Sequence, residues 1–140
     1  MVYLALTHDT QGTWLPREPG PAAEVQSWLS ISSRELWAGP SSARLVKLFG
    51  AKIDHERAVS TANAVLGSLF EPHLREQAWL VGSAPTIADI ACYSYLRVAP
   101  EGGVSLKPYP SVRSWLERLE ALPGFPEMAA AADLLASGTP

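Results

Sequence analysis

The chain has 140 residues, of which 47% are hydrophobic, and it carries a formal net charge of −3 at pH 7. This length and composition are typical of a single globular domain with a substantial core. The 14 acidic residues outnumber the 11 basic residues, and no segment concentrates lysine and arginine. We therefore expect no nucleic-acid partner and no attachment to an anionic membrane.

Cysteine occurs once, at Cys92, which excludes a disulfide within one chain. The N-terminus lacks the basic segment and long apolar run of a signal peptide, and no stretch of about 18 apolar residues could span a bilayer. We therefore expect a soluble, cytoplasmic protein in a reducing compartment.

The first residues divide into a short apolar run and a connector. Residues 1–6 are apolar but too few for an independent helix, which needs about 12 residues. We interpret residues 1–9 as the end of an element that begins before them. Residues 10–21 contain three prolines and two glycines, which is typical of a linker.

Helical periodicity begins at Ala22, because Val25, Leu29, Ser32 and Leu36 fall on one face. Glycine accepts a left-handed cap and proline cannot continue a helix, so we predict that this helix ends at residues 39–40. A shorter helix is expected from residue 42 to residue 49.

A second long helix is predicted after Asp54, with an apolar stripe that reaches Leu74 and a kink or break at Pro72. Residues 78–82 are expected to be extended or turn-like. Residues 86–99 are apolar almost all round, which indicates a central buried helix. A further helix should begin at Pro110, and a weak final helix is expected within residues 129–136. The fold class is therefore all-α, a helical bundle.

Thr86 and Asp89 form the best-defined local motif. The spacing is that of a capping box, in which the threonine oxygen accepts a backbone N–H and the carboxylate reaches back to the amide of Thr86. Aspartate at a helix start also meets the positive end of the helix dipole. We assign both residues a structural role.

The sequence offers little for catalysis or metal binding. His8, His55 and His73 are scattered without metal-ligand spacing. Cys92 lies in the central apolar helix, where a small buried side chain is the expected role. We therefore predict no catalytic residue, no cofactor-binding residue and no metal site.

Several segments resemble the C-terminal helical domain of glutathione S-transferases, in a bacterial branch of that family. The resemblance covers roughly the whole chain and rests on an ordered set of motifs. These are Gly39–Pro40 through Arg44, Phe49–Gly50, Gly82 to Ala91, Ala99 to Val104, Tyr109–Pro110, Trp115–Leu116 and Leu122 to Phe125.

The resemblance implies a protein of two parts. In that family, a thioredoxin-like N-terminal domain binds glutathione and activates its sulfur, and the helical domain builds much of the pocket for a hydrophobic electrophile. Met1–Ala5 resembles the remainder of the last helix of the first domain, just beyond the family's Glu-Ser pair. Residues 1–9 would then be that remnant, 10–21 the linker and 22–140 the helical domain, and the glutathione site would be largely absent.

For the co-substrate pocket, the resemblance points to Ser33, Trp37 and Arg44 on and after the first long helix. The alternative is that small serines there simply allow close helix packing. Family membership also implies a homodimer. Because the thiol-activating donors belong to the other domain, the isolated chain should be inactive. A second interpretation is a non-catalytic module for protein–protein assembly, like similar domains in translation factors and synthetase complexes.

Overall fold

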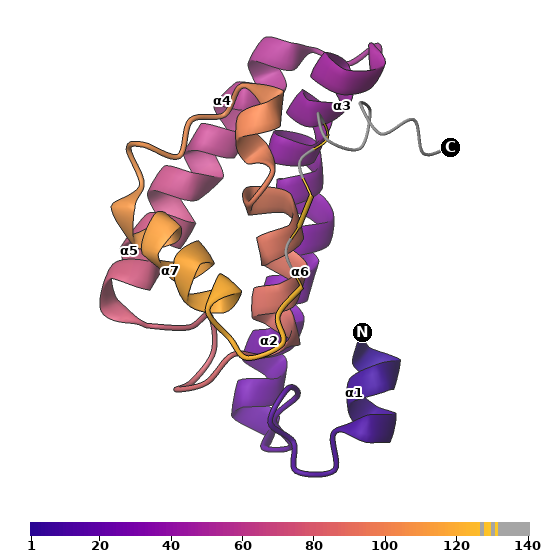
Figure 1. Ribbon diagram of the computed structural model, residues 1–140, viewed down its shortest axis with the longest axis vertical. Coiled ribbons are helices and arrows are strands. Elements are labelled where there is room, and N and C mark those ends of the chain that lie inside the picture. The colour runs from indigo at the N-terminus through magenta and orange to yellow at the C-terminus, as the bar shows by residue number, and fades with distance from the viewer. Residues whose placement is uncertain (127, 130, 132–140) are drawn as a thin grey trace.

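The longest helical run joins three consecutive elements. α2 (Pro19–Ile31) continues into the π-helical η1 (Ser32–Ser41) and then into α3 (Ser42–Phe49), which ends at Gly50 with φ 64°. Figure 1 shows this run as one column along the long axis of the molecule. The computed structural model describes residues 1–126, 128–129 and 131.

The predicted helix end at Gly39–Pro40 is wrong, because both residues lie inside η1 and are buried. In an α-helix, proline removes one backbone hydrogen bond and its ring clashes with the carbonyl four residues earlier. In a π-helix each hydrogen bond spans five residues instead of four. Here the N–H of Ser42 donates to the carbonyl of Trp37, five residues back. The helix therefore passes through Pro40 without breaking.

Gly39 has a packing role in place of the predicted capping role. A Cβ built on Gly39 would lie 2.9 Å from the backbone Cα and N of Ala62. Gly102 is similar, since its Cβ would lie 2.6 Å from the backbone N of Arg44. These two glycines let helical segments approach one another more closely than any other residue would allow.

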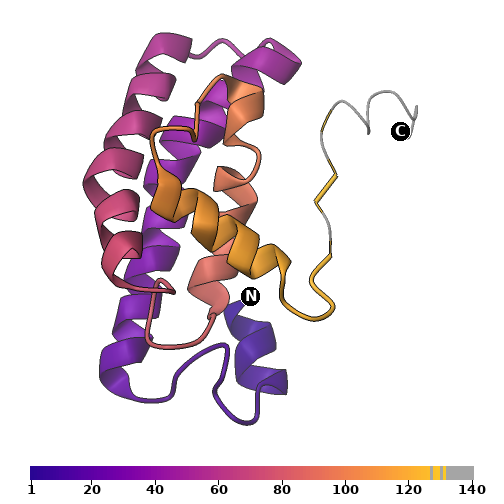
Figure 2. The ribbon, with the colours of Figure 1, turned by 60° about the vertical axis from the view of Figure 1, so that its left-hand side comes forward.

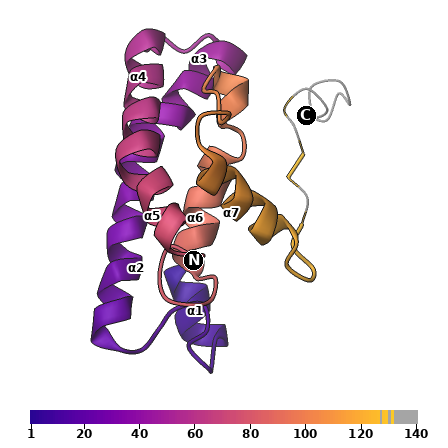
Figure 3. The ribbon, with the colours of Figure 1, turned by 90° about the vertical axis from the view of Figure 1, so that its left-hand side faces the viewer.

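The second helical run comprises α4 (His55–Val65), the π-helical η2 (Leu66–Phe70) and α5 (Glu71–Glu76). Asp54 caps α4 by accepting the N–H of Arg57 at 3.0 Å. The run does not break at Pro72, which lies in the first turn of α5, directly after the π-helical η2. α4 packs against η1, so that the two runs lie side by side (Figure 3).

The central helix is α6 (Ile87–Leu96), which packs against α2 and η1. It is followed by the 3-10 helix η3 (Ala99–Gly102) and by α7 (Pro110–Glu120), which crosses the bundle and packs on α5 (Figure 2). The fold is all-α, as predicted, and the described residues contain no β-strand. The core is centred on α6, and its largest fully buried side chains include Trp115, Phe70, Leu36 and Leu96.

The N-terminal helix α1 (Val2–His8) lies at one end of the bundle and exposes most of its apolar side chains. Tyr3 and Leu6 are 75% and 70% exposed. The linker is anchored rather than free, because the N–H of Ile87 donates to the carbonyl of Trp14 at 2.9 Å. The carboxylate of Asp9 also accepts backbone N–H groups from residues 13, 14 and 15.

The predicted weak helix at 129–136 falls mostly outside the described residues. Among the described residues, none of the helices combines the length and apolar character that crossing a membrane requires.

The close approach at Gly39 predicts a stability loss on substitution. Gly39→Ala should lower the free energy of unfolding by about 1–3 kcal/mol, because the new methyl meets backbone atoms that move only with a whole helix. Gly67 on η2 is a matched control, since its Cβ would meet nothing nearer than 3.7 Å. Gly67→Ala should stabilise by about 0.5–1 kcal/mol. Urea unfolding measures both, and equal effects at the two positions would contradict the close packing.

Candidate functional site

The buried carboxylate of Asp89 is the polar centre of the bundle. One oxygen accepts the N–H and hydroxyl of Thr86, at 2.8 and 3.1 Å. The other accepts the N–H of Leu80 at 3.0 Å and the indole N–H of Trp115 at 2.9 Å. The side chain is fully buried, so these four bonds replace the water that a charged carboxylate would otherwise need.

The capping box at the start of α6 is complete. The hydroxyl oxygen of Thr86 accepts the N–H of Ala88 at 3.2 Å, while Asp89 returns to the Thr86 amide. The sequence motif predicted these local hydrogen bonds. It did not foretell the bonds to Leu80 and Trp115, which come from a preceding loop and from α7.

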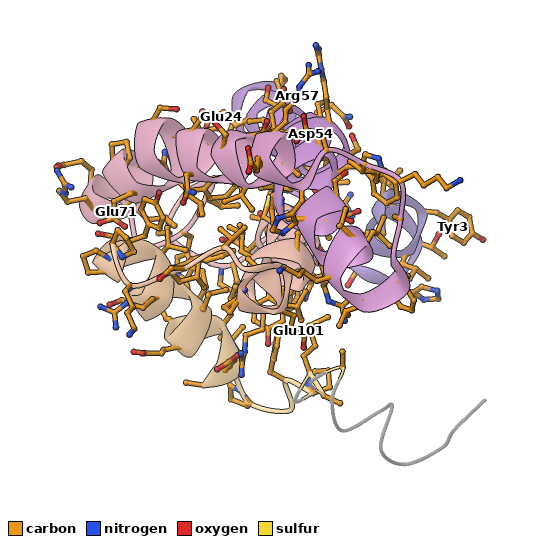
Figure 4. The ribbon with its side chains drawn as sticks, turned by 90° about the horizontal axis from the view of Figure 1, so that it is seen from above. Tyr3, Glu24, Asp54, Arg57, Glu71 and Glu101 are labelled. Atoms are coloured by element: carbon orange, nitrogen blue, oxygen red, sulfur yellow. The ribbon has the colours of Figure 1, made fainter. Side chains whose placement is uncertain are left out.

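Glu71 is a buried cap that the sequence analysis missed. Its carboxylate accepts the N–H groups of Ser111 and Val112 at the start of α7, from a position on α5. Figure 4 shows Glu71 on the side of the bundle away from Asp54. The sequence contains one indication of this cap. Tyr109 precedes α7 and supplies no side-chain cap, so the first N–H groups of α7 need an acceptor from elsewhere.

The three residues predicted for a co-substrate pocket lie on the continuous run of η1 and α3 and differ in their surroundings. Ser33 is exposed, and its hydroxyl donates to the carbonyl of Ser30 at 3.0 Å. Trp37 is 52% exposed on η1. Arg44 forms an ion pair with Glu101 across α3 and η3. Of the three, only Trp37 lines the hollow between η1 and α4, and none lines the cleft beside α6.

Trp37 borders a surface hollow of about 560 Å³ between η1 and the start of α4. Ile53 lies in the same hollow and is 42% exposed. Charged residues of both signs surround the two apolar side chains: Arg34, Glu35, Asp54 and Arg57. Figure 4 shows Asp54 and Arg57 close together at this side of the bundle.

A larger, more apolar cleft lies between α6 and the segment that follows α7. It encloses about 660 Å³, within the size range of small-molecule sites. Ile90, Tyr93 and Ser94 of α6 line one side, and Trp14 and Pro85 line one end. The opposite wall is formed by Leu122, Pro123, Gly124, Phe125, Pro126 and Met128.

Two polar groups border this cleft. The Tyr93 hydroxyl donates to Glu120 at 3.0 Å, and Glu120 also pairs with Arg97. Desolvation, strengthened by this hydrogen bond to Glu120, raises the pKa of Tyr93 to about 12. Tyr93 is therefore a neutral phenol near pH 7. Ser94 donates to the carbonyl of Ala91, which leaves its oxygen lone pairs able to accept from a ligand.

Cys92, His55 and His73 are engaged in packing or in hydrogen bonds to the backbone, whereas His8 is exposed. Burial raises the pKa of the Cys92 thiol, and the charge of Asp89 adds to this effect. A protonated thiol is a poor nucleophile. His55 and His73 contact the carbonyls of Gly102 and Trp79 at 2.8 and 3.3 Å. Within the part of the chain that the structure describes, no three metal-binding side chains gather in one place.

Sequence comparison identifies known proteins that are similar to this chain. Residues 42–123 match the family described as "Glutathione S-transferase, C-terminal domain". A glutathione S-transferase-like protein of Aspergillus fumigatus is 37% identical over 82 residues, which cover 49% of this chain and 36% of that protein. A glutathione S-transferase of Clonostachys rogersoniana is 25% identical over 142 residues, covering 94% of this chain and 58% of the relative. The chain thus spans less than two thirds of either relative.

Solved structures show the same fold. A glutathione S-transferase from Xanthobacter autotrophicus superposes with a TM-score of 0.85 at 27% identity, covering 95% of this chain and 67% of the other. A glutathione transferase family member from Pseudomonas fluorescens with two bound glutathione molecules superposes with a TM-score of 0.73 at 28% identity. The match covers 87% of this chain and 56% of the other. Because the relatives are fungal as well as bacterial, a bacterial branch stays a prediction.

The bonds of Asp89 predict an order of stability losses. Thr86→Ala should cost about 1 kcal/mol, as for an ordinary cap. Asp89→Ala should cost more, about 1–3 kcal/mol, because it strands buried donors on three segments. Asp54→Ala removes an exposed cap and serves as the comparison. Equal, negligible shifts in the urea midpoint for Thr86→Ala and Asp89→Ala would contradict the assignment.

Proposed function

The chain belongs to the glutathione S-transferase C-terminal domain family, and from that premise we propose that it supplies the co-substrate half of a glutathione-transferase-like protein. In this proposal the helices bind a hydrophobic electrophile, while a separate thioredoxin-like domain binds glutathione and activates its thiol. The observation that carries the proposal is the apolar cleft of about 660 Å³ beside α6.

The chemistry of the cleft favours an apolar ligand with few hydrogen-bonding groups. Ile90, Phe125 and Met128 offer apolar contact area, and the Trp14 indole is 37% exposed at one end. Burying apolar ligand surface against such walls contributes about 25 cal/mol per Å². Because Ser33, Trp37 and Arg44 lie outside this cleft, the proposal places the co-substrate beside α6 rather than on η1.

The thiol chemistry needs groups that the described side chains of this cleft do not provide. A glutathione thiolate is stabilised by a nearby hydrogen-bond donor or positive charge. The Tyr93 hydroxyl already donates to Glu120, and Arg97 is paired with the same carboxylate. We therefore assign thiol activation to another domain and propose that this chain is inactive alone.

The N-terminal segment supports a two-part arrangement. We propose that residues 1–9 end the preceding domain, residues 10–21 link the two parts and residues 22–140 form the helical domain. Tyr3, Leu4 and Leu6 on α1 are 58–75% exposed, and apolar clusters of this kind are usually covered by a partner surface. The single buried cysteine is compatible with a reducing, cytoplasmic location, which we include in the proposal.

Self-association is the second part of the proposal. The hollow around Trp37 combines apolar side chains with two basic and two acidic residues, Arg34, Arg57, Glu35 and Asp54. A twofold dimer brings a surface against its own copy, so charges of both signs can pair across it. We therefore propose that η1 and the start of α4 form a homodimer contact.

The proposed function predicts that the isolated chain binds an apolar ligand but does not catalyse glutathione conjugation. The isolated chain should show no saturable, glutathione-dependent conjugation of an aromatic electrophile such as 1-chloro-2,4-dinitrobenzene. It should nevertheless bind the apolar fluorophore 1-anilinonaphthalene-8-sulfonate, because that ligand needs only the cleft. Ser94→Leu places a larger side chain in the cleft and should weaken this binding at least tenfold.

Ser27→Leu is the matched control for that variant, since Ser27 is an exposed serine on α2 whose hydroxyl also donates to a backbone carbonyl. It should leave fluorophore binding unchanged. Saturable turnover by the isolated chain would refute the assignment of thiol activation to another domain. Unchanged binding in Ser94→Leu would refute the cleft.

The proposed dimer contact predicts that a substitution at Trp37, but not one at Tyr3, weakens dimerisation. Trp37→Glu should raise the dimer dissociation constant at least tenfold, because it buries an unpaired charge in the contact. Tyr3→Glu alters a more exposed aromatic residue on α1 and should change the dissociation constant little. Light scattering over a concentration series measures both. Dissociation by Tyr3→Glu alone would show that α1, not η1, mediates association.

A further inference from the structure

Trp14 in the linker is held through both of its backbone groups. Its N–H donates to the carboxylate of Asp9, the residue that ends α1, at 2.6 Å. Its carbonyl accepts the N–H of Ile87, the first residue of α6, at 2.9 Å. The linker runs between α1 and α2 at one end of the bundle (Figure 1). Trp14 therefore connects the end of α1 to the start of α6.

Asp9 holds a whole turn of the linker. One carboxylate oxygen accepts the N–H of Thr13 at 3.0 Å, and the other accepts the N–H of Leu15 at 3.1 Å in addition to that of Trp14. Desolvation works to raise the pKa of Asp9, but the backbone N–H groups of residues 12–15 outweigh it and lower that pKa. Asp9 is therefore a carboxylate at neutral pH and uses both oxygens. An amide side chain would offer only one acceptor oxygen here.

The hydrogen bond between Trp14 and Ile87 also completes the start of α6. The first N–H groups of a helix have no partner within the helix. The capping box satisfies the N–H of Ala88, and the Trp14 carbonyl satisfies that of Ile87. Because Ile87 is buried, water does not readily replace the Trp14 carbonyl. The backbone of Trp14 thus has one favourable position relative to α6.

This position places Trp14 at one end of the apolar cleft, beside Pro85. Ser94, which also lines the cleft, follows Ile87 by seven residues and so lies about 10 Å further along the axis of α6. A ligand that contacts both Trp14 and Ser94 therefore spans about 10 Å, which suits two fused rings with one polar substituent. The rings of Tyr93 and Phe125 already contact one another, so the ligand lies beside them and not between them.

We propose that Asp9 is a positioning residue that holds Trp14 at the end of the cleft, and that Trp14 makes the cleft select flat aromatic ligands whose hydrogen-bond donor meets Ser94. This inference rests on the proposed function, because it concerns the same cleft. Asp9 does not line the cleft and acts through Trp14. An aromatic ligand ring gains an interaction with the indole that a saturated ring of similar size lacks.

The test compares 2-naphthol with its saturated counterpart, decahydro-2-naphthol, by isothermal titration calorimetry. The ratio of their dissociation constants measures the preference for the aromatic ligand, and the unaltered chain should bind 2-naphthol more tightly. Trp14→Leu should lower this preference about fivefold, because it removes the aromatic contact. Trp14→Phe keeps an aromatic ring and should retain most of the preference.

Asp9→Asn tests the positioning role. It should lower the preference for 2-naphthol about threefold, because one acceptor oxygen and the negative charge are lost and Trp14 is held less firmly. Glu76→Gln is the control, since it makes the same change of charge at an exposed residue at the end of α5. It should leave the preference unchanged.

Hydrogen exchange provides a readout that a general loss of stability would not reproduce. In Asp9→Asn, the Ile87 amide should exchange about tenfold faster, because the Trp14 carbonyl is no longer held against it. The Val112 amide, which Glu71 holds, should keep its rate. Equal acceleration of both amides would indicate global destabilisation and would overturn the positioning role.

Ser94→Leu separates this inference from the proposed function. If it weakens the binding of both naphthols while Trp14→Leu and Asp9→Asn leave the preference unchanged, the cleft stands and the roles of Trp14 and Asp9 are refuted. If Ser94→Leu affects neither ligand, the cleft itself is refuted. A preference that falls in Trp14→Leu and Asp9→Asn but persists in Trp14→Phe supports the inference. A fall in Trp14→Leu alone refutes the positioning role of Asp9.

Discussion

The four hydrogen bonds to the buried carboxylate of Asp89 tie together the parts of the bundle that matter most for function. They fix the start of α6, the loop at Leu80 and the indole of Trp115 on α7 relative to one another. A buried charge is tolerated only when its hydrogen-bonding capacity is satisfied, so each of these segments has one favourable position. The apolar cleft is built on this frame, because α6 forms one of its walls and the segment after α7 forms the other.

Close backbone approaches set the remaining geometry. Gly39 allows η1 to contact α4 at Ala62, and Gly102 allows η3 to contact α3 at Arg44. The second approach brings Arg44 beside Glu101, and the pair in turn holds Ala131.

In the proposed function, apolar binding and thiol chemistry are divided between domains because the polar side chains beside the cleft already have hydrogen-bond partners. Tyr93 and Arg97 beside the cleft are both committed to Glu120, and Cys92 is kept neutral by burial. The cleft thus offers apolar contact and the lone pairs of Ser94, which suit a hydrophobic co-substrate. Activation of a sulfur requires donors or charge that another domain would have to bring.

The sequence by itself determined the helices, the buried character of α6 and the capping box, because periodicity and capping are local properties of neighbouring residues. It misplaced the helix end at Gly39–Pro40, because the π-helical register that accommodates Pro40 and the packing of Gly39 against α4 are not visible in the local sequence. The cap that Glu71 supplies to α7 and the hydrogen bond from the Ala131 N–H to Glu101 both depend on pairs distant in the chain. Only the tertiary structure decides such pairs, because side-chain packing, and not local propensity, sets which helix faces meet.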